Sequence, residues 1–149
     1  VQTCALPISL NDFVQNLGID INISGFIYNG GPVNKDSIKL LHTNDWSCSN
    51  TLRLNDTFSI SSSRDALIRI SNNDCPKQWR LFYGICGWAP NQLISEIKGI
   101  PPYTHNTSWC TVSSDIDLIF KTNNKEQWNA ALEKSADEFA KSIDLNYLT

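Results

Sequence analysis

The stretch from residue 79 to residue 97 constrains the fold of this chain more than any other segment. Leu81–Ile85 is an apolar run that predicts a strand, and Gly84 and Gly87 supply the backbone freedom for a tight turn after it. Pro90 suits the first position of a helix, and apolar residues at helical spacing follow it. The sequence therefore predicts a strand, a tight turn and a helix in succession.

Composition sets limits on the class of protein. The chain has 149 residues, of which 41% are hydrophobic and 18% charged, enough for one globular domain with a core of its own. The formal charge is -3 and the basic residues are scattered, which argues against direct nucleic-acid binding. No window holds the roughly 18 apolar residues of a membrane span, so we expect no membrane contact and a cytoplasmic location.

The cysteines argue against a metal centre. Their number is odd, their spacing is irregular and no Cys-x-x-Cys pair occurs; they are Cys4, Cys48, Cys75, Cys86 and Cys110. Only His42 and His105 could join them as ligands. We therefore expect thiols in a reducing compartment, and neither a metal nor another cofactor.

The remaining elements follow from hydrophobic period and turn residues. Helices are predicted after the cap Ser9, from Arg64 and after the cap Asn123. Strands are predicted over residues 26–28, 38–42, 57–60, 109–112 and 118–120, and loops over 45–55 and 72–77. This irregular interleaving predicts an α+β class, a single domain with a mixed β-sheet packed by helices.

We interpret the first eight residues as foreign to the protein. Residues 1–8 can be encoded by a widely used sequencing-adapter sequence, so we interpret them as a non-native segment and exclude them from fold reasoning. Residues 9–149 then form the domain, and the segment that precedes it in the natural protein is expected to be missing.

Several fragments, in this order, resemble the YqgE/AlgH family of bacterial proteins. The resemblance runs from about Leu10 to the C-terminus. The matching fragments are Leu17–Ile19, Gly30–Val33, Leu41-His42, Ser62–Leu67, Gly84–Leu93, Glu96-Ile97, Ser108-Trp109, Leu118–Phe120 and Trp128–Leu132. The family resemblance implies a compact α+β domain with a large mixed sheet. It also implies either a transcriptional regulator or a protein of open function, with no established catalytic residues or cofactor.

Two departures from the family pattern carry consequences. Family members have strands and a Gly-Leu-Val-Ile-Asn-Arg-Pro-like motif before the first helix, and this chain does not, which supports missing N-terminal strands. Cys86 stands where the family more often has alanine. A residue that alanine replaces is a poor essential nucleophile, so a Cys86–His42 hydrolase is disfavoured.

The first candidate binding residues lie at a turn and at a strand end. Gly30, Gly31 and Pro32 could bind an anion through backbone N–H groups, but they lack the spacing and lysine of a phosphate loop, and a structural turn explains them better. His42 could act as a base or ligand near neutral pH. A hydrogen-bonded, partly buried imidazole is the favoured alternative.

Two helix starts supply the other candidates. Ser63, Arg64 and Asp65 could hold a carboxylate or phosphate, but a serine cap with an acidic first turn also explains them fully and is the favoured interpretation. The second group is a turn–helix that could line a pocket or form a solvated helix edge. Its residues are Gly87, Trp88, Gln92 and Glu96.

Together these residues predict a binding or regulatory module rather than an enzyme. Such a module would work through a protein partner, and a transcriptional regulator acting through protein contacts is one form of it. The alternative is a small-ligand-binding protein or an enzyme that uses a pocket near His42, Arg64 and Trp88. Both require these candidate residues to converge in space.

Overall fold

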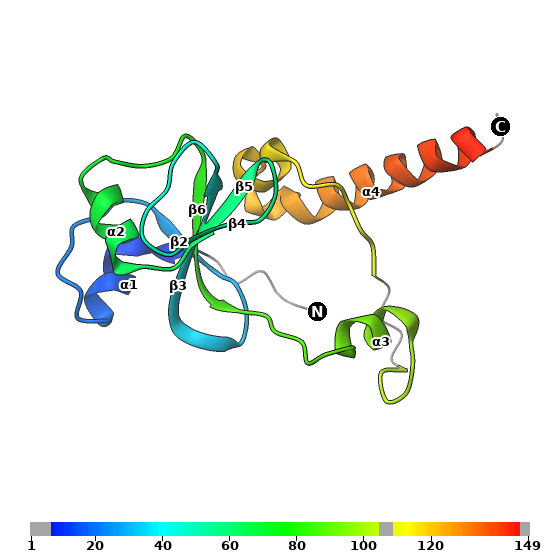
Figure 1. The fold of residues 1–149 in the computed structure, drawn as a ribbon, viewed down its shortest axis with the longest axis horizontal. Helices are drawn as coiled ribbons and strands as arrows, with labels where there is room; N and C mark the ends of the chain where they lie inside the picture. The colour runs from blue at the N-terminus through cyan, green and yellow to red at the C-terminus, as the bar shows by residue number, and fades with distance from the viewer. Residues whose placement is uncertain (1–6, 105–108, 147–149) are drawn as a thin grey trace. The chain divides into compact units, whose positions relative to one another are not determined.

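The structure is a computed structural model that describes residues 7–104 and 109–146, with side chains up to residue 143. Its contacts divide the chain into two compact units, which meet in the sequence between Gly87 and Trp88 (Figure 1). We call them the sheet unit and the helical unit. Most of the segment interpreted as adapter-derived, residues 1–6, lies outside the described residues, so that interpretation stays a prediction.

The sheet unit is built on a six-stranded mixed sheet of the order β1-β2-β6-β3-β5-β4. Strands β2 and β6 pair in parallel and every other neighbouring pair is antiparallel. This architecture confirms the predicted α+β class with a mixed sheet. The strands are β1 (Ile8–Ser9), β2 (Phe26–Asn29), β3 (Val33–Thr43), β4 (Thr51–Arg53), β5 (Phe58–Ser61) and β6 (Trp79–Ile85).

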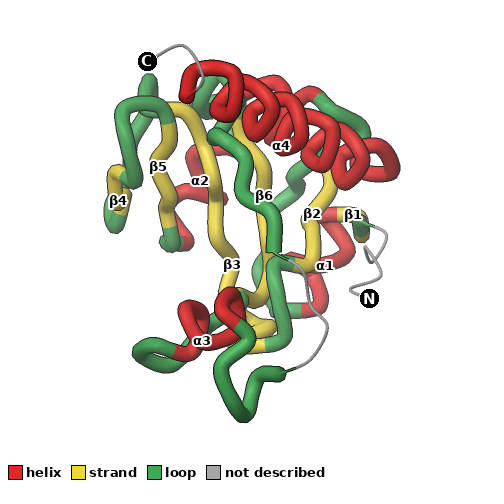
Figure 2. The backbone as a smooth tube through the Cα atoms, turned by 90° about the vertical axis from the view of Figure 1, so that its right-hand side faces the viewer, coloured by secondary structure: helices red, strands yellow, loops and turns green. Residues whose placement is uncertain are grey.

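Two helices, α1 (Leu10–Asn16) and α2 (Arg64–Ser71), cover one face of this sheet. Figure 2 shows both behind the strands. Their apolar residues form one buried cluster with the inward residues of β2, β3 and β6; the cluster is Leu10, Val14, Ile23, Ile27, Leu40, Ala66, Leu67, Ile70 and Leu81. Burial of this apolar surface is the main force that holds the unit together.

The predicted caps of both helices are confirmed. The Ser9 hydroxyl accepts a hydrogen bond from the Asp12 N–H at 3.4 Å, and the Ser63 hydroxyl accepts one from the Ala66 N–H at 3.2 Å. Each bond satisfies a backbone donor that the first helical turn leaves without an intrahelical acceptor.

The strand boundaries differ from the sequence prediction at two places. Strand β3 begins at Val33 rather than Ile38, after an irregularity that shifts its register against β6 between these two residues. Strand β4 lies inside the region predicted as a loop, where it pairs with β5. Polar residues crowd around this three-residue edge strand, which hides the strand pattern in the sequence.

The helical unit contains α3 (Gln92–Lys98), a π-helical turn η1 (Asp117–Lys121) and the long helix α4 (Asn124–Asn146). Helix α3 begins two residues later than predicted, after Asn91, and Gly99 at φ 62° ends it as predicted. At the start of α4 the Asn123 carbonyl side chain accepts the Lys125 N–H at 3.1 Å, as expected of a cap.

Two predicted strands of this unit are wrong. Residues 118–120 belong to η1, because the Asp115 carboxylate accepts the N–H groups of Asp117 and Leu118 at 2.8 and 3.0 Å and starts a helical turn there. Residues 109–112 form no strand, and the Thr111 carbonyl instead accepts the Ser135 hydroxyl at 2.8 Å. Short apolar runs do not distinguish strand from helix by period alone.

None of the helices in the described ranges combines the length and apolar content needed to cross a membrane. Within the same ranges, no three side chains of His, Cys, Asp or Glu gather where they could hold a metal ion. Cys48, Cys75 and Cys110 are free thiols.

Candidate functional site

The Gly30–Pro32 turn is shaped by close packing against the end of β6. A Cβ atom on Gly31, at φ 151°, would lie 2.2 Å from the Ile85 carbonyl carbon, and one on Gly30 would lie 2.6 Å from the Gly84 oxygen. The Gly30 N–H donates to the Tyr83 oxygen at 2.8 Å, and the Gly31 N–H donates to the Asn29 side chain at 2.9 Å. Both donors are therefore engaged within the fold, which favours the structural interpretation of this turn.

His42 is fully buried and hydrogen-bonded at both ring nitrogens. Its Nδ1 lies 2.8 Å from the Thr43 carbonyl oxygen, which can only accept, so Nδ1 carries the proton. Its Nε2 then accepts from the Ser61 hydroxyl at 2.9 Å, and the Ser61 Oγ lies 2.7 Å from the Thr51 Oγ1. The edge of the Trp46 ring contacts the imidazole at a centroid distance of 5.2 Å. This enclosure favours a structural imidazole over a base that meets a substrate.

The residues at the start of α2 have structural partners as well. Ser63 caps the helix, and the Asp65 carboxylate accepts the Ser49 hydroxyl at 3.2 Å and the Ser49 N–H at 3.4 Å. Arg64 is exposed and borders a wide polar depression of 430 Å³ together with Asp20, Ile21, Asn22, Ile68, Ser71 and Asn72. His42 is not among the residues that line this depression.

A cation–aromatic cluster supports the loop beside His42. The Arg69 guanidinium lies 4.6 Å from the centre of the Trp46 ring and pairs with Asp74 at 2.6 Å, while the Trp46 indole N–H donates to Asp74 at 2.9 Å. The hydrogen bond from Arg69, together with that from Trp46, lowers the pKa of Asp74. These contacts fix Trp46 against the imidazole.

The sequence candidates of the sheet unit do not form one surface. His42 and Ser63 are linked through Ser61, Thr51 and Cys48, whose thiol lies 3.5 Å from the Ser63 hydroxyl. The Gly30–Pro32 turn precedes β3, whereas His42 is its last residue but one. At about 3.3 Å per residue, the length of this strand separates the two.

In the helical unit, one cluster of side chains is joined by mutual hydrogen bonds: Trp88, Gln92 and Glu96. The Gln92 side chain accepts the Ala89 N–H at 2.9 Å and donates to Glu96 at 2.8 Å, and the Trp88 indole N–H donates to Glu96 at 3.3 Å. The Trp88 ring also meets Trp109 edge to face at a centroid distance of 6.2 Å. Gly87 lies outside this cluster, as the last residue of the sheet unit.

Helix α4 carries an exposed apolar surface. Four large side chains at helical spacing are exposed there, which we call the α4 stripe: Trp128 (69% exposed), Leu132 (40%), Phe139 (68%) and Ile143 (39%). In a helix with 3.6 residues per turn they share an arc of about 60°. Soluble proteins seldom leave such contiguous apolar side chains uncovered unless they bind something.

Polar contacts hold the segment from Trp109 to Asp115 along one side of α4. The Lys134 ammonium pairs with Asp115 at 2.7 Å, and Ser113 donates its N–H to Glu138 at 3.0 Å and its hydroxyl to the same carboxylate. The Lys134 contact lowers the pKa of Asp115 to about 2, and the Ser113 contacts lower the pKa of Glu138. Both carboxylates are thus engaged in fixing the segment.

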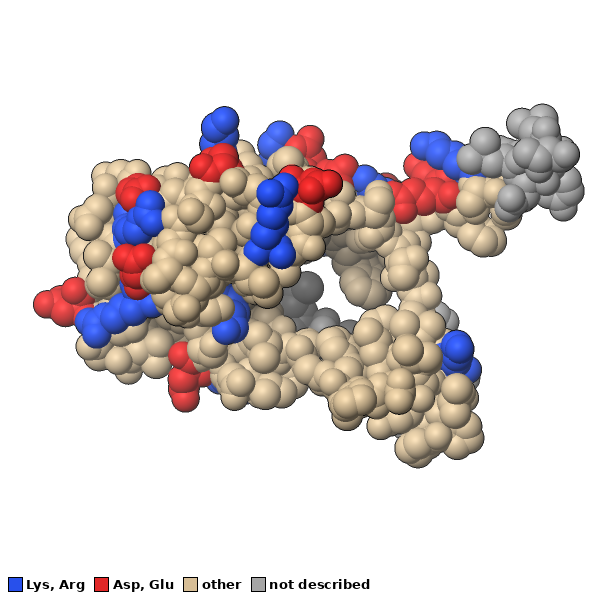
Figure 3. All heavy atoms as spheres, viewed as in Figure 1, with Lys and Arg blue, Asp and Glu red and all other residues tan. Residues whose placement is uncertain are grey.

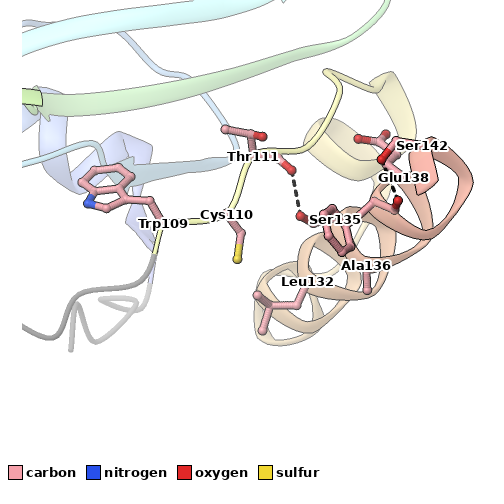
Figure 4. A pocket seen from close by; sticks show the side chains of 9 residues that line it. Trp109, Cys110, Thr111, Leu132, Ser135, Ala136, Glu138 and Ser142 are labelled. Carbon is pink, nitrogen blue, oxygen red and sulfur yellow. Dashed lines mark hydrogen bonds between the residues drawn. The ribbon is translucent and has the colours of Figure 1, made fainter. Parts of the chain in front are cut away.

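Between this segment and α4 runs a groove, shown in Figure 4. Its larger part has a volume of 680 Å³ and lies between Trp109–Thr111 on one side and Leu132 and Phe139 on the other. An adjoining hollow of 240 Å³ extends it toward Trp128. The groove can hold an apolar side chain or helix, and we take it together with the α4 stripe as the candidate functional site.

The candidate residues predicted from the sequence are not those of this surface. The sequence predicted α4 as a helix from its hydrophobic period and its Asn123 cap, and assigned no function to its apolar residues. The feature that could have pointed to a surface is the size of this stripe, since Trp128 and Phe139 lie on a helix whose opposite face is charged. Periodicity identifies the apolar face of a helix, and it does not identify what covers that face.

Comparison with known proteins places the chain in a family. The sequence model of the family described as AlgH-like matches residues 3–140. A UPF0301 protein of Marinomonas sp. (strain MWYL1) is 35% identical over 128 residues, which cover 83% of this chain and 64% of that relative. A UPF0301 protein of Azoarcus sp. (strain BH72) is 32% identical over 142 residues, covering 91% of this chain and 71% of the relative.

A solved structure shares the fold. The solution structure of the AlgH protein from Pseudomonas aeruginosa superposes with a TM-score of 0.70 at 27% sequence identity. The match covers 86% of this chain and 67% of that protein. The chain thus spans roughly two thirds of the length of these relatives.

Proposed function

The chain belongs to the AlgH-like family, and from this premise we propose that it is a regulatory module that works through contacts with other protein chains. The observation that carries this proposal is the exposed α4 stripe beside its groove. Large aromatic side chains dominate the energetics of protein interfaces, and Trp128 and Phe139 are the most exposed residues of the stripe.

The charge distribution supports a protein partner over a nucleic acid. In the view of Figure 3, the Lys and Arg side chains are interspersed with Asp and Glu rather than gathered into one basic surface. The charged residues of α4 lie mainly opposite its stripe and include both signs, namely Glu126, Glu133, Lys134, Asp137 and Lys141. Binding along a nucleic-acid backbone relies on clustered basic side chains.

The groove also suits binding better than catalysis. The Glu138 carboxylate in the groove accepts a hydrogen bond from the Ser113 N–H. The Ser135 hydroxyl, which also lines the groove, donates to the Thr111 carbonyl. Cys110 supplies an exposed thiol. A pocket for acid–base chemistry would instead hold titratable groups within reach of a substrate.

Affinity purification from the native host tests the proposal. We expect proteins that co-purify with the wild-type chain to be lost with Phe139→Glu, which places a charge on the stripe. Leu52→Glu is the matched control, because Leu52 is also a largely exposed apolar residue but lies on β4. Retention of the same proteins by Phe139→Glu would refute the proposal. A gel shift with DNA that weakens steeply with salt would favour direct nucleic-acid binding.

A further inference from the structure

The four residues of the α4 stripe are placed symmetrically about its centre. Trp128 and Ile143 lie equally far from the centre of the stripe, between Ser135 and Ala136, and so do Leu132 and Phe139. Two antiparallel copies of α4 that cross at this centre therefore bring Leu132 of each copy against Phe139 of the other. The same crossing brings each Trp128 against Ile143.

We propose that a second copy of this chain docks on the α4 stripe as an antiparallel helix pair with two-fold symmetry. A two-fold interface uses the same surface on both copies, so the surface must complement itself. The proposal rests on the proposed function in one respect, namely that the α4 stripe is a protein-contact surface.

The residues at and beside the crossing point suit close approach of two helices. Ala136 is small, so two backbones can come near each other on its side of the stripe, while Ser135 on the other side donates its hydroxyl to the Thr111 carbonyl at 2.8 Å. Ala131, Ala140 and Ser142 flank the stripe and bring no charge into the contact. Helix α4 spans 23 residues, about 35 Å, so the whole stripe can take part.

The exposed area is of the size that a reversible dimer needs. With full side-chain areas of roughly 150–250 Å² for the aromatic residues, the exposed parts of the stripe amount to about 500 Å² per chain. Two copies together would bury about 1,000 Å², near the lower limit for specific interfaces. Trp109, 43% exposed at the side of the groove, adds to this area. We therefore expect a dimer whose population depends on concentration.

Sedimentation equilibrium of the full chain over a concentration series tests the proposal. We expect a monomer–dimer equilibrium for the wild type, and dissociation at least about tenfold easier for Phe139→Glu and for Leu132→Lys. Combining the two substitutions sets opposite charges face to face across the copies, so the double variant should dimerise better than either single variant. Leu52→Glu should dimerise as the wild type does.

Three outcomes would overturn the antiparallel pair. They are a wild type that stays monomeric throughout, a dimer that neither single substitution weakens, and a double variant no better than the weaker single one. If every stripe variant, including Trp128→Glu, loses cooperative unfolding, the stripe packs within the chain. That result would also overturn the antiparallel pair. A monomeric wild type whose co-purifying proteins still depend on Phe139 would refute the dimer alone and leave the proposed function standing.

Discussion

Helices α2 and α4 carry the same kind of apolar spacing and meet opposite surroundings. The inward residues of α2, Ala66, Leu67 and Ile70, are at most 7% exposed against the sheet, whereas the α4 stripe is 39% to 69% exposed. The first pattern stabilises the chain by removing apolar surface from water, and the second leaves that surface free for association. The difference shows that an apolar helix face becomes a core or an interface according to what the rest of the fold places against it.

The sharpest test of this difference is to truncate a leucine in each environment. Leu81, fully buried on β6, should cost about 2–5 kcal/mol of unfolding free energy when changed to alanine, through lost burial and the cavity left behind. Leu132→Ala should cost less than about 1 kcal/mol in the monomer. Denaturant titration at low protein concentration measures both, and equal losses would contradict the contrast.

Substitutions at two glycines of the sheet unit distinguish the cost of backbone strain from the cost of overpacking. Gly84 and Gly18 have nearly the same φ, 69° and 68°, but a Cβ on Gly84 would lie 2.4 Å from the Gly31 oxygen and one on Gly18 would contact nothing within 4 Å. Gly18→Ala should cost about 1–2 kcal/mol for the left-handed conformation alone. Gly84→Ala should cost about 1–3 kcal/mol more through overpacking. Similar losses in thermal or denaturant unfolding would argue against the close approach of the turn and β6.

The buried hydroxyl beside His42 should matter more than its exposed neighbour. Ser61→Ala leaves the imidazole Nε2 without its donor in a buried site, at a cost of about 1–3 kcal/mol of unfolding free energy. Ser62, which accepts from Lys39 at the surface, is the control and should change stability by less than about 0.5 kcal/mol. An effect of Ser61→Ala as small as that of Ser62→Ala would contradict the structural role of His42.

The smallest effect is electrostatic and belongs to the helical unit. Lys134, together with the backbone N–H groups of Leu118 and Asp117, lowers the pKa of Asp115 from 3.8 to about 2, so these contacts stabilise the folded chain above the unfolded value of 3.8. Their contribution is lost as the pH falls toward 2. Lys134→Ala should raise the pKa of Asp115 toward 3.8, as a carboxyl ¹³C titration by NMR would show. An unchanged titration curve would mean that the segment is not held to α4 through this pair.

The sequence was informative where local chemistry decides the structure. The caps Ser9, Ser63 and Asn123 and the stop at Gly99 follow from side-chain hydrogen bonding and left-handed backbone, which depend on a few neighbouring residues. The apolar run Leu81–Ile85 predicted the strand β6 in the same way, and the family resemblance implied the mixed sheet.

The sequence was uninformative where distant contacts decide. Residues 118–120 are held in their helical turn in part by Gln127, nine residues beyond Leu118, which donates to the Leu118 carbonyl at 2.8 Å. The enclosure of His42 depends on Ser61 and Trp46, which lie on other parts of the chain. The exposure of the α4 stripe depends on what packs against this helix, a property that no local pattern contains.

The pairing of the stripe with a second copy can be measured directly by isotope-filtered NOE spectroscopy on a mixture of labelled and unlabelled chain. We expect cross-peaks between copies that join the Leu132 methyl groups to the Phe139 ring, and the Ile143 methyl groups to the Trp128 ring. If these four residues give cross-peaks within their own chain and none between copies, the interface on α4 is contradicted.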